Sequence, residues 1–363
     1  MTAAETLRYG VIGGGMMARE HIANLALIPG SAVTAIADPD SGQQALNAEA
    51  APDAALLADA AALVGRDDVD AVIVASPNHT HLDVLEQVFA GPPRPVLVEK
   101  PVVTTPCLGE RLTALAASWR APLWVAMEYR YMPPIAALRE ELRKGVAGPL
   151  KMLTIREHRY PFLEKVGHWN RFNANTGGTM VEKCCHFFDL MRLILEDEPR
   201  RIYATGGADV NHREERYGGR CPDIIDNAYA VVDFAGGARA MLELCMFAEG
   251  AWFQEEITAT GAKGRVACCI PGPERRVGGH AREAMLEISP RAPIEPRRLP
   301  VPVDPAVLGA GEHHGSTYYQ HLRFREAALG RGAVEVTLAD GLKAVAMGAA
   351  AERSIAEGVP VDL

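Results

Sequence analysis

The chain has 363 residues, 37 Lys and Arg against 46 Asp and Glu, and a formal net charge of −9. With 48% hydrophobic residues it has the composition of a globular protein, which excludes wholesale disorder, and its length predicts two domains. The acidic balance argues against a nucleic-acid partner, because such partners select basic surfaces.

The seven cysteines include no C-x-x-C pair. This pattern predicts reduced thiols and neither a disulfide framework nor a zinc site, and the histidines also lack the spacing of metal ligands. No apolar run approaches the roughly 20 residues that cross a bilayer, and residues 1–5 lack the basic region of a leader peptide. We therefore expect no metal, no membrane association and a cytoplasmic protein.

Short apolar runs alternate with helical segments through the first third of the chain. We expect strands at residues 9–12, 32–38, 71–75, 96–98 and 123–127, and helices at residues 16–27, 60–64, 81–89 and 108–119, with one more helix ending near residue 50. This alternation predicts a doubly wound parallel sheet covered by helices on both faces. Such sheets bind ligands at the carboxyl ends of their strands.

A glycine-rich turn, Gly13-x-Gly15-x-x-Ala18, joins the first strand to the first helix. Its glycines permit a tight turn and close approach of backbone N–H groups to a pyrophosphate, which would lie at the helix N-terminus beside Met16 and Met17. Asp38 ends the second strand, where a carboxylate can accept hydrogen bonds from a ribose and would repel a 2′-phosphate. The pattern predicts NAD in preference to NADP, although Asp38 could instead cap the next helix.

Polar residues also follow the third and fourth strands. Residues 76–81 read Ser-Pro-Asn-His-Thr-His, and Glu99-Lys100-Pro101 follows the fourth strand. A lysine at the end of a buried strand is costly unless it is paired or used. The favoured interpretation is that these strand-end residues belong to a functional site. The alternative is that Lys100 is solvated and that Asn78 or Thr80 caps a helix.

Longer alternating segments follow Gly148-Pro149 and predict a second domain in which helices cover a sheet. We expect strands at residues 151–159, 201–206, 227–234, 239–247, 255–260 and 265–269, a hairpin at Gly236-Gly237, and helices at residues 187–195, 317–329 and 338–358. Residues 272–305 are expected to be irregular apart from a short strand at residues 285–288. Within them, Arg275-Arg276 and Arg297-Arg298 are expected to be solvated loop charges.

Glu182 and His186 form a second candidate cluster. Their i, i+4 spacing places them on one face of a helix that starts near Gly178. A carboxylate beside an imidazole fixes the tautomer and raises the pKa, which suits a general base. The alternative is a purely structural pair.

These motifs together resemble the Gfo/Idh/MocA family of oxidoreductases. The resemblance includes Glu128-Tyr129-Arg130-Tyr131-x-Pro133, Gly177-Gly178-Thr179, and the C-terminal region around residues 340–354. It implies an N-terminal Rossmann NAD-binding domain at residues 1–131, followed at residues 132–363 by a substrate-binding and oligomerisation domain. The implied fold of this second domain is α/β with a large, open, mainly antiparallel sheet. The resemblance also implies a homodimer or homotetramer.

The resemblance implies that Lys100, Glu182 and His186 are catalytic. Cofactor contacts are then expected from the residues at the strand ends: Gly13, Gly15, Met16, Met17, Asp38, Ser76, Asn78, His81, Glu99, Lys100 and Glu128. Substrate contacts are expected from residues of the second domain and the C-terminal region: Arg130, His158, Trp169, Asn170, Arg171, Lys183, His314 and Tyr318.

Two positions depart from the family pattern: Glu182 stands where an Asp is usual, and Lys183 where a small residue is common. Lys183 could bind a substrate hydroxyl or point outward. The implied activity is NAD-dependent oxidation of a secondary hydroxyl of a cyclic polyol or sugar. Alternatives are reduction of a keto-sugar, glycoside cleavage through a 3-keto intermediate, and a non-catalytic sugar or nucleotide sensor.

Overall fold

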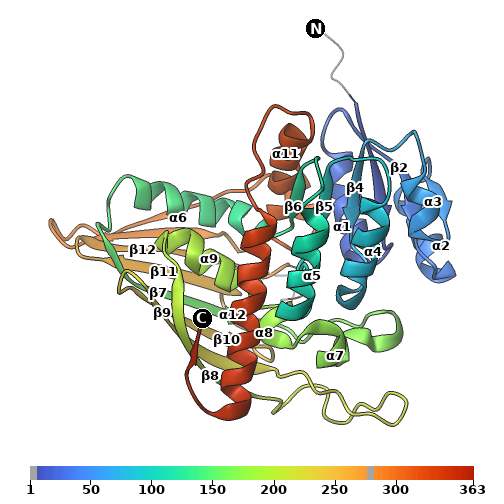
Figure 1. The fold of residues 1–363 in the computed structure, drawn as a ribbon. Helices are drawn as coiled ribbons and strands as arrows, with labels where there is room; N and C mark the ends of the chain where they lie inside the picture. The colour runs from blue at the N-terminus through green and yellow to red at the C-terminus, as the bar shows by residue number, and fades with distance from the viewer. Residues whose placement is uncertain (1–5, 275, 277–281) are drawn as a thin grey trace, which may run out of the picture. The chain divides into compact units, whose positions relative to one another are not determined.

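The computed structural model describes residues 6–274, 276 and 282–363, and it divides the chain into two compact units (Figure 1). The first unit contains the residues up to Glu128 together with Ala306–Gly311 and Gly315–Val345. The second contains Tyr129–Pro305, Glu312–His314 and Ala346–Leu363. Neither unit is continuous in the sequence, since the chain returns to the first unit before its C-terminus. Residues 1–5, on which the expectation about a leader peptide rests, lie outside the described residues, and so does Arg275.

The first unit is built on a six-stranded sheet in the order β3-β2-β1-β4-β5-β6, and every neighbouring pair is parallel. Its strands are β1 (Leu7–Ile12), β2 (Ser31–Ala37), β3 (Ala55–Leu57), β4 (Ala71–Val74), β5 (Val96–Val98) and β6 (Leu123–Val125). The predicted doubly wound parallel sheet is confirmed. The short edge strand β3 was not predicted, because three residues give no readable period.

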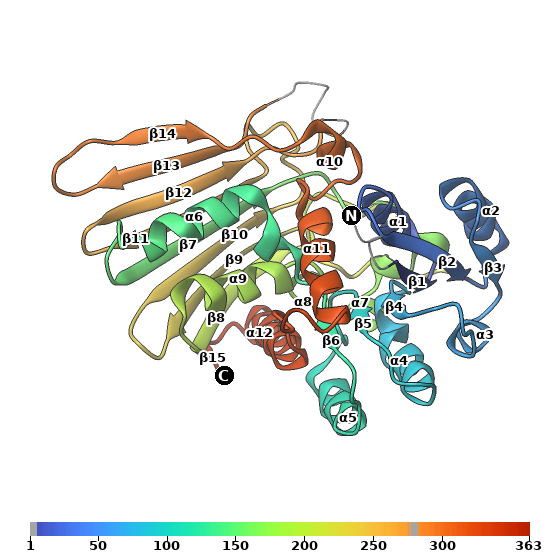
Figure 2. The same ribbon diagram turned by 90° about the horizontal axis from the view of Figure 1, so that it is seen from above.

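The helices of this unit are α1 (Met16–Ala26), α2 (Ser41–Ala50), α3 (Ala60–Val64), α4 (His81–Phe89), α5 (Pro106–Ala116) and α11 (Ser316–Ala328). Polar side chains fix several helix starts: the Asp40 side chain accepts from Gln43 N at 2.8 Å at the start of α2. Helix α11 comes from the C-terminal part of the sequence and packs against α1 (Figure 2).

The second unit contains a nine-stranded sheet in the order β14-β13-β12-β11-β7-β10-β9-β8-β15. Its strands are β7 (Leu150–His158), β8 (Pro199–Gly207), β9 (Asn227–Phe234), β10 (Arg239–Cys245), β11 (Glu255–Gly261), β12 (Gly264–Ile270), β13 (Met285–Pro290), β14 (Arg297–Pro300) and β15 (Val361–Asp362). All neighbours are antiparallel except β7 and β10. The Gly236-Gly237 turn joins β9 to β10 with Gly237 at φ +82°, as a hairpin requires.

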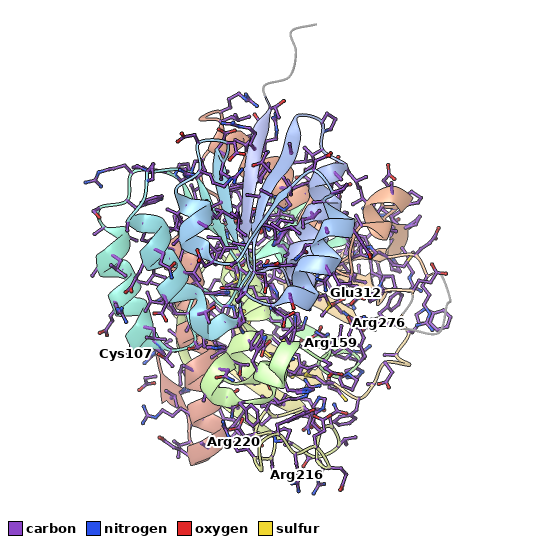
Figure 3. All side chains as sticks on the ribbon, turned by 90° about the vertical axis from the view of Figure 1, so that its right-hand side faces the viewer. Cys107, Arg159, Arg216, Arg220, Arg276 and Glu312 are labelled. Atoms are coloured by element: carbon purple, nitrogen blue, oxygen red, sulfur yellow. The ribbon has the colours of Figure 1, made fainter. Side chains whose placement is uncertain are left out.

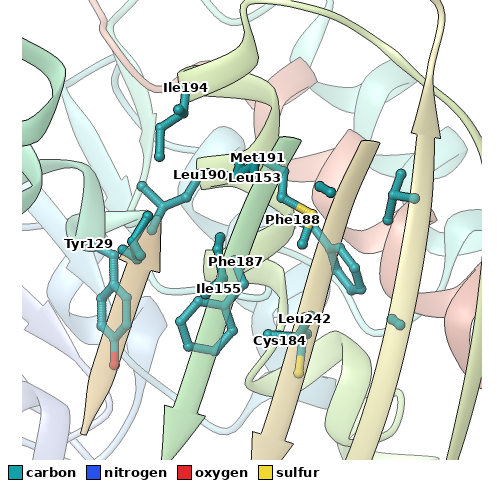
Figure 4. Close-up of a cluster of buried hydrophobic side chains, with 14 of the residues drawn as sticks. Tyr129, Leu153, Ile155, Cys184, Phe187, Phe188, Leu190, Met191, Ile194 and Leu242 are labelled. Atoms are coloured by element: carbon teal, nitrogen blue, oxygen red, sulfur yellow. The ribbon is translucent and has the colours of Figure 1, made fainter. Parts of the chain in front are cut away.

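Helices α6 (Pro133–Arg143) and α9 (Cys185–Leu195) pack on one face of this sheet (Figures 1 and 2). Buried and partly exposed residues alternate along β7, β9 and β10, so the helix-covered face is apolar. Phe187 and Phe188 of α9 meet Ile155 and Leu242 there (Figure 4). The long helix α12 (Leu338–Glu357) contributes its last turns to this unit.

The expectation that residues 272–305 are irregular apart from one strand is wrong at its end. Residues Arg297–Pro300 form β14, which pairs with β13, and a short helix α10 (Pro305–Gly309) follows. All four residues of β14 are exposed, so its pairing depends on backbone hydrogen bonds and leaves no alternating pattern in the sequence. Arg297 and Arg298 are exposed strand residues, not loop residues.

In the part of the chain that the structure describes, no helix has the length and apolar character that spanning a membrane requires.

Candidate functional site

The glycine turn after β1 has the geometry of a phosphate-binding loop. Gly13 has φ +90°, and a Cβ there would overlap the backbone of Ser76. A Cβ on Gly15 would meet nothing within 4 Å, so open space lies above the N-terminus of α1. Ala18 is fully buried, where only a small side chain lets the helix pack closely on the sheet.

Asp38 follows β2 and faces this turn. Its Oδ2 accepts from Gly14 N at 2.6 Å and its Oδ1 from Asp40 N at 2.8 Å. The side chain that caps α2 is that of Asp40, so the interpretation of Asp38 as a helix cap is wrong. Asp38 is instead held at the carboxyl end of β2 with its carboxylate beside the glycine turn.

Two residues that support the turn were not predicted from the sequence. Asn47 Nδ2 donates to the Gly14 carbonyl at 3.0 Å, and Arg19 Nη1 donates to the same oxygen at 2.8 Å. Asn47 is the buried residue of α2, and its burial is visible only in the structure, so the sequence did not indicate this role. Together they fix the peptide between Gly13 and Gly15.

Polar groups gather at the ends of β4 and β5, as the sequence predicts. His81 is buried with Nδ1 2.8 Å from the Pro101 carbonyl and Nε2 2.9 Å from the Ser76 carbonyl, so it joins the two loops. Burial lowers the pKa of His81. The Thr80 hydroxyl donates to the Pro77 carbonyl at 2.7 Å and lies 2.8 Å from Ser76 Oγ, and it does not cap α4.

Asn78 provides a direct test of whether this edge fits a dinucleotide. Its side chain is buried, and its Nδ2 has no hydrogen-bond partner among the described residues. A buried amide donor without a partner is costly, and a ligand acceptor would satisfy it. With the space above Gly15 and the carboxylate of Asp38, the residues present fit NAD, which would lie along this edge with its pyrophosphate at α1.

Glu99 and Lys100 follow β5. Glu99 is buried with Oε1 3.0 Å from His21 Nε2, while its Oε2 accepts from the Lys100 backbone N at 3.2 Å. Glu99 was expected to contact cofactor, but its side chain points inward and supports the backbone of Lys100. Lys100 itself is only partly buried.

The expectation that one helix carries both Glu182 and His186 is wrong. Helix α8 (Thr179–Glu182) ends before α9 begins at Cys185. The Thr179 carbonyl accepts from both Lys183 N at 2.9 Å and Cys184 N at 3.2 Å, so the turn contains an extra residue. That residue rotates α9 relative to α8, and the i, i+4 spacing does not imply a shared face. Both side chains are nevertheless buried.

His186 lies flat against Tyr129: the ring centroids are 4.1 Å apart and the planes differ by 6°. Lys183 is buried and points inward, which excludes its pointing outward to solvent. Its Nζ donates to Tyr129 Oη at 2.6 Å and lies 2.8 Å from Glu157 Oε1. Desolvation lowers the Lys183 pKa, and the nearby Glu157 opposes that shift.

The sequence did not reveal the buried charges around Lys183. Glu157 and Glu255 face each other across β7 and β11, and both are buried. Burial, and then the charge of Glu157, raise the pKa of Glu255 to about 7. Arg159 Nη1 lies 3.8 Å from Glu157 Oε1. A glutamate at an inward position of an apolar strand was the available signal in each case.

Several residues predicted to contact substrate are held by protein groups. Arg130 Nε donates to Asp189 Oδ2 at 2.6 Å in a buried pair. Asn170 Nδ2 donates to the Leu163 carbonyl at 2.9 Å, and Arg171 Nε donates to Glu215 at 3.0 Å. These contacts order the loop that leads to α7 (Asn173–Thr176). Trp169, in the same loop, is partly exposed.

The structure does not bring all predicted substrate residues together. His158 lies 2.9 Å from Glu243 on the sheet face opposite to Glu157, because successive strand residues alternate in direction. His314 is partly buried, with φ +49°, and burial lowers its pKa to about 4. Tyr318, in the first unit, packs edge-on against Tyr319.

Glu312 anchors a further cluster in the second unit. Arg276 lies beside it, with Nη2 2.9 Å from Glu312 Oε1, so this arginine is paired and not only solvated (Figure 3). Tyr160 Oη donates to Glu312 Oε2 at 3.1 Å, and Arg159 lies over the Tyr160 ring at 4.5 Å.

Among residues 6–274, 276 and 282–363, no group of three or more His, Cys, Asp or Glu side chains could hold a metal ion.

The fold and the glycine turn define a dinucleotide-binding Rossmann domain, and the family models identify the chain as an oxidoreductase. Residues 7–127 match the model of the oxidoreductase family NAD-binding Rossmann fold, and residues 139–363 match that of the C-terminal alpha/beta domain of the same family. The chain belongs to the Gfo/Idh/MocA family of oxidoreductases, and the resemblance inferred from the motifs is confirmed.

Relatives match over most of the chain. Inositol 2-dehydrogenase from Acidothermus cellulolyticus is 29% identical over 79% of this chain and 80% of its own length. Inositol 2-dehydrogenase 2 from Paenarthrobacter aurescens is 30% identical over 67% of this chain and 70% of its own length. Among solved structures, an oxidoreductase domain protein from Kribbella flavida superposes with a TM-score of 0.81 at 21% identity, covering 98% of this chain and 99% of that chain. Levoglucosan dehydrogenase in complex with NADH and levoglucosan superposes with a TM-score of 0.80 at 19% identity, covering 99% of this chain and 99% of that chain.

Proposed function

We propose that this chain oxidises a secondary hydroxyl group of a cyclic polyol or sugar, with NAD as the hydride acceptor. The observation that carries the proposal is the family match along nearly the whole chain, which includes inositol 2-dehydrogenases over two thirds or more of its length. The retained Lys100 and His186 support an enzyme in preference to a sensor, because a sensor needs neither a cation nor a base at the reacting carbon.

His186 would accept the hydroxyl proton, and Lys100 would stabilise the negative charge that develops on the oxygen. Bound NAD supplies the acceptor carbon of the nicotinamide ring. Glu182 is buried at the end of α8, and the proposal keeps for it the role that the family pattern implies, orienting the imidazole of His186, although the two residues lie in different helices.

The choice of NAD over NADP rests on Asp38. Its carboxylate is fixed by Gly14 N and Asp40 N at the end of β2, so it cannot turn away from a ligand without losing two hydrogen bonds. A fixed negative charge there accepts from ribose hydroxyls and repels a 2′-phosphate.

For the substrate, we propose contacts from Trp169 and His314. Trp169 is partly exposed, and His314 Nε2 has no hydrogen-bond partner among the described residues. A neutral imidazole can both donate to and accept from sugar hydroxyls. Arg130, Asn170 and Arg171 are proposed to hold the surrounding loops, as their protein contacts indicate.

We further propose a homodimer or homotetramer formed through the sheet face that α6 and α9 leave uncovered. Large side chains are exposed there: Tyr203 on β8, Tyr229 and Val231 on the adjacent strand β9, and Met152 on β7, which β10 separates from β9. An apolar patch of this kind marks an interaction surface. Light scattering at several concentrations measures the assembly, and a strict monomer contradicts this proposal.

The activity is tested by following NADH absorbance with the purified protein against inositols, hexoses, levoglucosan and other glycosides, with NAD and NADP in parallel. NADH formation with a polyol or sugar supports the proposal. Tightly bound cofactor without net reduction for any of them contradicts it and favours a glycosidase that recycles its cofactor. Absence of cofactor binding contradicts both.

A further inference from the structure

Lys183 occupies a position that the mechanism proposed above does not use. It lies in the turn between α8 and α9, immediately before the helix that carries His186. A buried lysine carries a large desolvation penalty, so its contacts must compensate for that penalty.

Its first contact is with a pair of carboxylates. Glu157 and Glu255 are directly opposite each other in the β7–β11 ladder, an arrangement that is unfavourable for like charges. Lys183 Nζ lies 2.8 Å from Glu157 Oε1. Arg159 lies farther away, at 3.8 Å from the same oxygen. Charge balance alone therefore gives Lys183 a structural role.

Its second contact is not explained by charge balance. Lys183 Nζ donates to Tyr129 Oη at 2.6 Å, shorter than its distance to Glu157. Tyr129 Oη in turn donates to Glu255 Oε1 at 3.4 Å. The ammonium also lies 4.7 Å from the Tyr129 ring centroid and 5.4 Å from that of Phe187. Tyr129 is thus held at its hydroxyl from two sides.

The ring that is held in this way is the one on which His186 lies. The Tyr129 and His186 rings are 4.1 Å apart and almost parallel, and both side chains are buried. Figure 4 shows Tyr129 in the apolar cluster with Phe187, and the two rings meet edge to face with their centroids 5.9 Å apart. A ring fixed at one end by hydrogen bonds and on its edge by Phe187 presents a fixed plane to the imidazole.

We propose that Lys183 is a positioning residue for His186: by holding Tyr129 Oη it fixes the ring plane against which the imidazole stacks. The proposal rests on the proposed dehydrogenase function for its kinetic consequences, but not for its structural ones. Lys183, which departs from the family pattern, thereby supports His186, the base that the family pattern implies.

Two variants separate positioning from charge balance. Lys183→Met with Glu157→Gln removes one positive and one negative charge together, so the net charge of the buried cluster does not change. Tyr129→Phe removes only the hydroxyl and keeps the aromatic ring. If Lys183 positions His186 through Tyr129, each lowers kcat by about 10- to 100-fold with little change in KM, since small misplacements of a catalytic group have effects of this size. Combining them adds little further loss, because both break one connection.

A spectroscopic measurement tests the same point without activity. The stacked Tyr129 ring shields the Cε1 proton of His186, and the His186→Gln variant assigns that signal among the 11 histidines of the chain. Both variants are expected to shift this resonance downfield. Ile155→Val, in the same strand as Glu157, is the matched control for lost stability and is expected to leave both kcat and the resonance unchanged.

The outcomes are distinct. Wild-type kcat and resonance in the Lys183→Met/Glu157→Gln variant overturn the proposal, because charge balance would then be the whole role of the lysine. A raised KM in that variant with a wild-type Tyr129→Phe also overturns it and assigns Lys183 to direct substrate contact. If the wild-type protein oxidises none of the polyols or sugars, the proposed function fails, and the His186 resonance alone decides the positioning role.

Discussion

His21 Nδ1 lies 2.8 Å from His321 Nε2, although 300 residues separate them in the sequence. Both imidazoles are fully buried, and His21 Nε2 lies 3.0 Å from Glu99 Oε1. The carboxylate accepts, so His21 donates through Nε2, and its Nδ1 then accepts from His321 Nε2–H. The reverse arrangement would leave a proton on His321 Nδ1, which is buried without a partner among the described residues. This series of hydrogen bonds continues to Lys100, whose backbone N donates to Glu99 Oε2.

His321→Leu should therefore destabilise the protein by roughly 1–3 kcal/mol, because it leaves His21 Nδ1 buried without its donor. Urea unfolding measures the difference. Arg323→Ala, an exposed residue on the same helix, is the control and should change the free energy of unfolding by about 1 kcal/mol or less. Equal losses in the two variants would show that the histidine contact contributes nothing specific.

Lys100→Met should lower kcat by about 100-fold or more while leaving the dissociation constant of NAD nearly unchanged. The cation acts on charge that develops during the reaction, not on the resting cofactor. Stopped-flow or steady-state rates give kcat, and titration of protein fluorescence gives NAD binding. Lys144→Met, at an exposed helix end, controls for loss of a lysine. An unchanged kcat in Lys100→Met removes this residue from the mechanism.

Asp38→Ala should weaken NAD binding by about tenfold or more and reduce the preference for NAD over NADP, because both the ribose acceptor and the repulsion of a 2′-phosphate are lost. Asp40→Ala is the matched control: it removes the cap of α2 and costs about 1 kcal/mol of stability without touching selectivity. The ratio of kcat/KM for the two cofactors measures the effect. Preference for NAD that survives in Asp38→Ala contradicts the assignment.

The sequence predicted the Rossmann elements closely because each carries its own local signal. The buried runs at Val96–Val98 and the glycine turn at Gly13 are readable without knowing their neighbours. The site contacts could not be predicted in the same way. The pairing of His21 with His321 joins α1 to α11, and that of Glu157 with Glu255 depends on the register of β7 and β11. The break between Glu182 and His186 depends on one shared carbonyl, which leaves no trace in residue spacing.

Glu352→Gln should flatten the dependence of stability on pH. Burial raises the pKa of Glu352 to about 7, although Met180 N donates to its Oε1 at 2.8 Å. Between about pH 4.5 and about pH 7 the folded protein keeps a proton that the unfolded chain has released, so stability falls as the pH rises through this window. The variant removes this loss, at most about 3 kcal/mol.

Urea unfolding at several pH values measures the slope. Glu255, whose pKa is also raised to about 7, titrates in the same window, so the slope should decrease by about one proton and not disappear. A slope identical to that of the wild type would mean that Glu352 is ionised in the folded protein at neutral pH.

His314→Gln should have the opposite sign. Burial lowers the pKa of His314 to about 4 from a value near 6.5, so between these pH values the unfolded chain binds a proton that the folded protein does not. Stability therefore falls as the pH falls through this window, and the contribution of His314 is fully present only above about pH 6.5. The variant should resist acid better than the wild type by about one proton of slope. In the wild type this term opposes those of Glu352 and Glu255 near pH 5 to 6, so adding His314→Gln to Glu352→Gln should return the slope to about its wild-type value. An acid slope that His314→Gln leaves unchanged would place a proton on His314 in the folded protein, in spite of its burial.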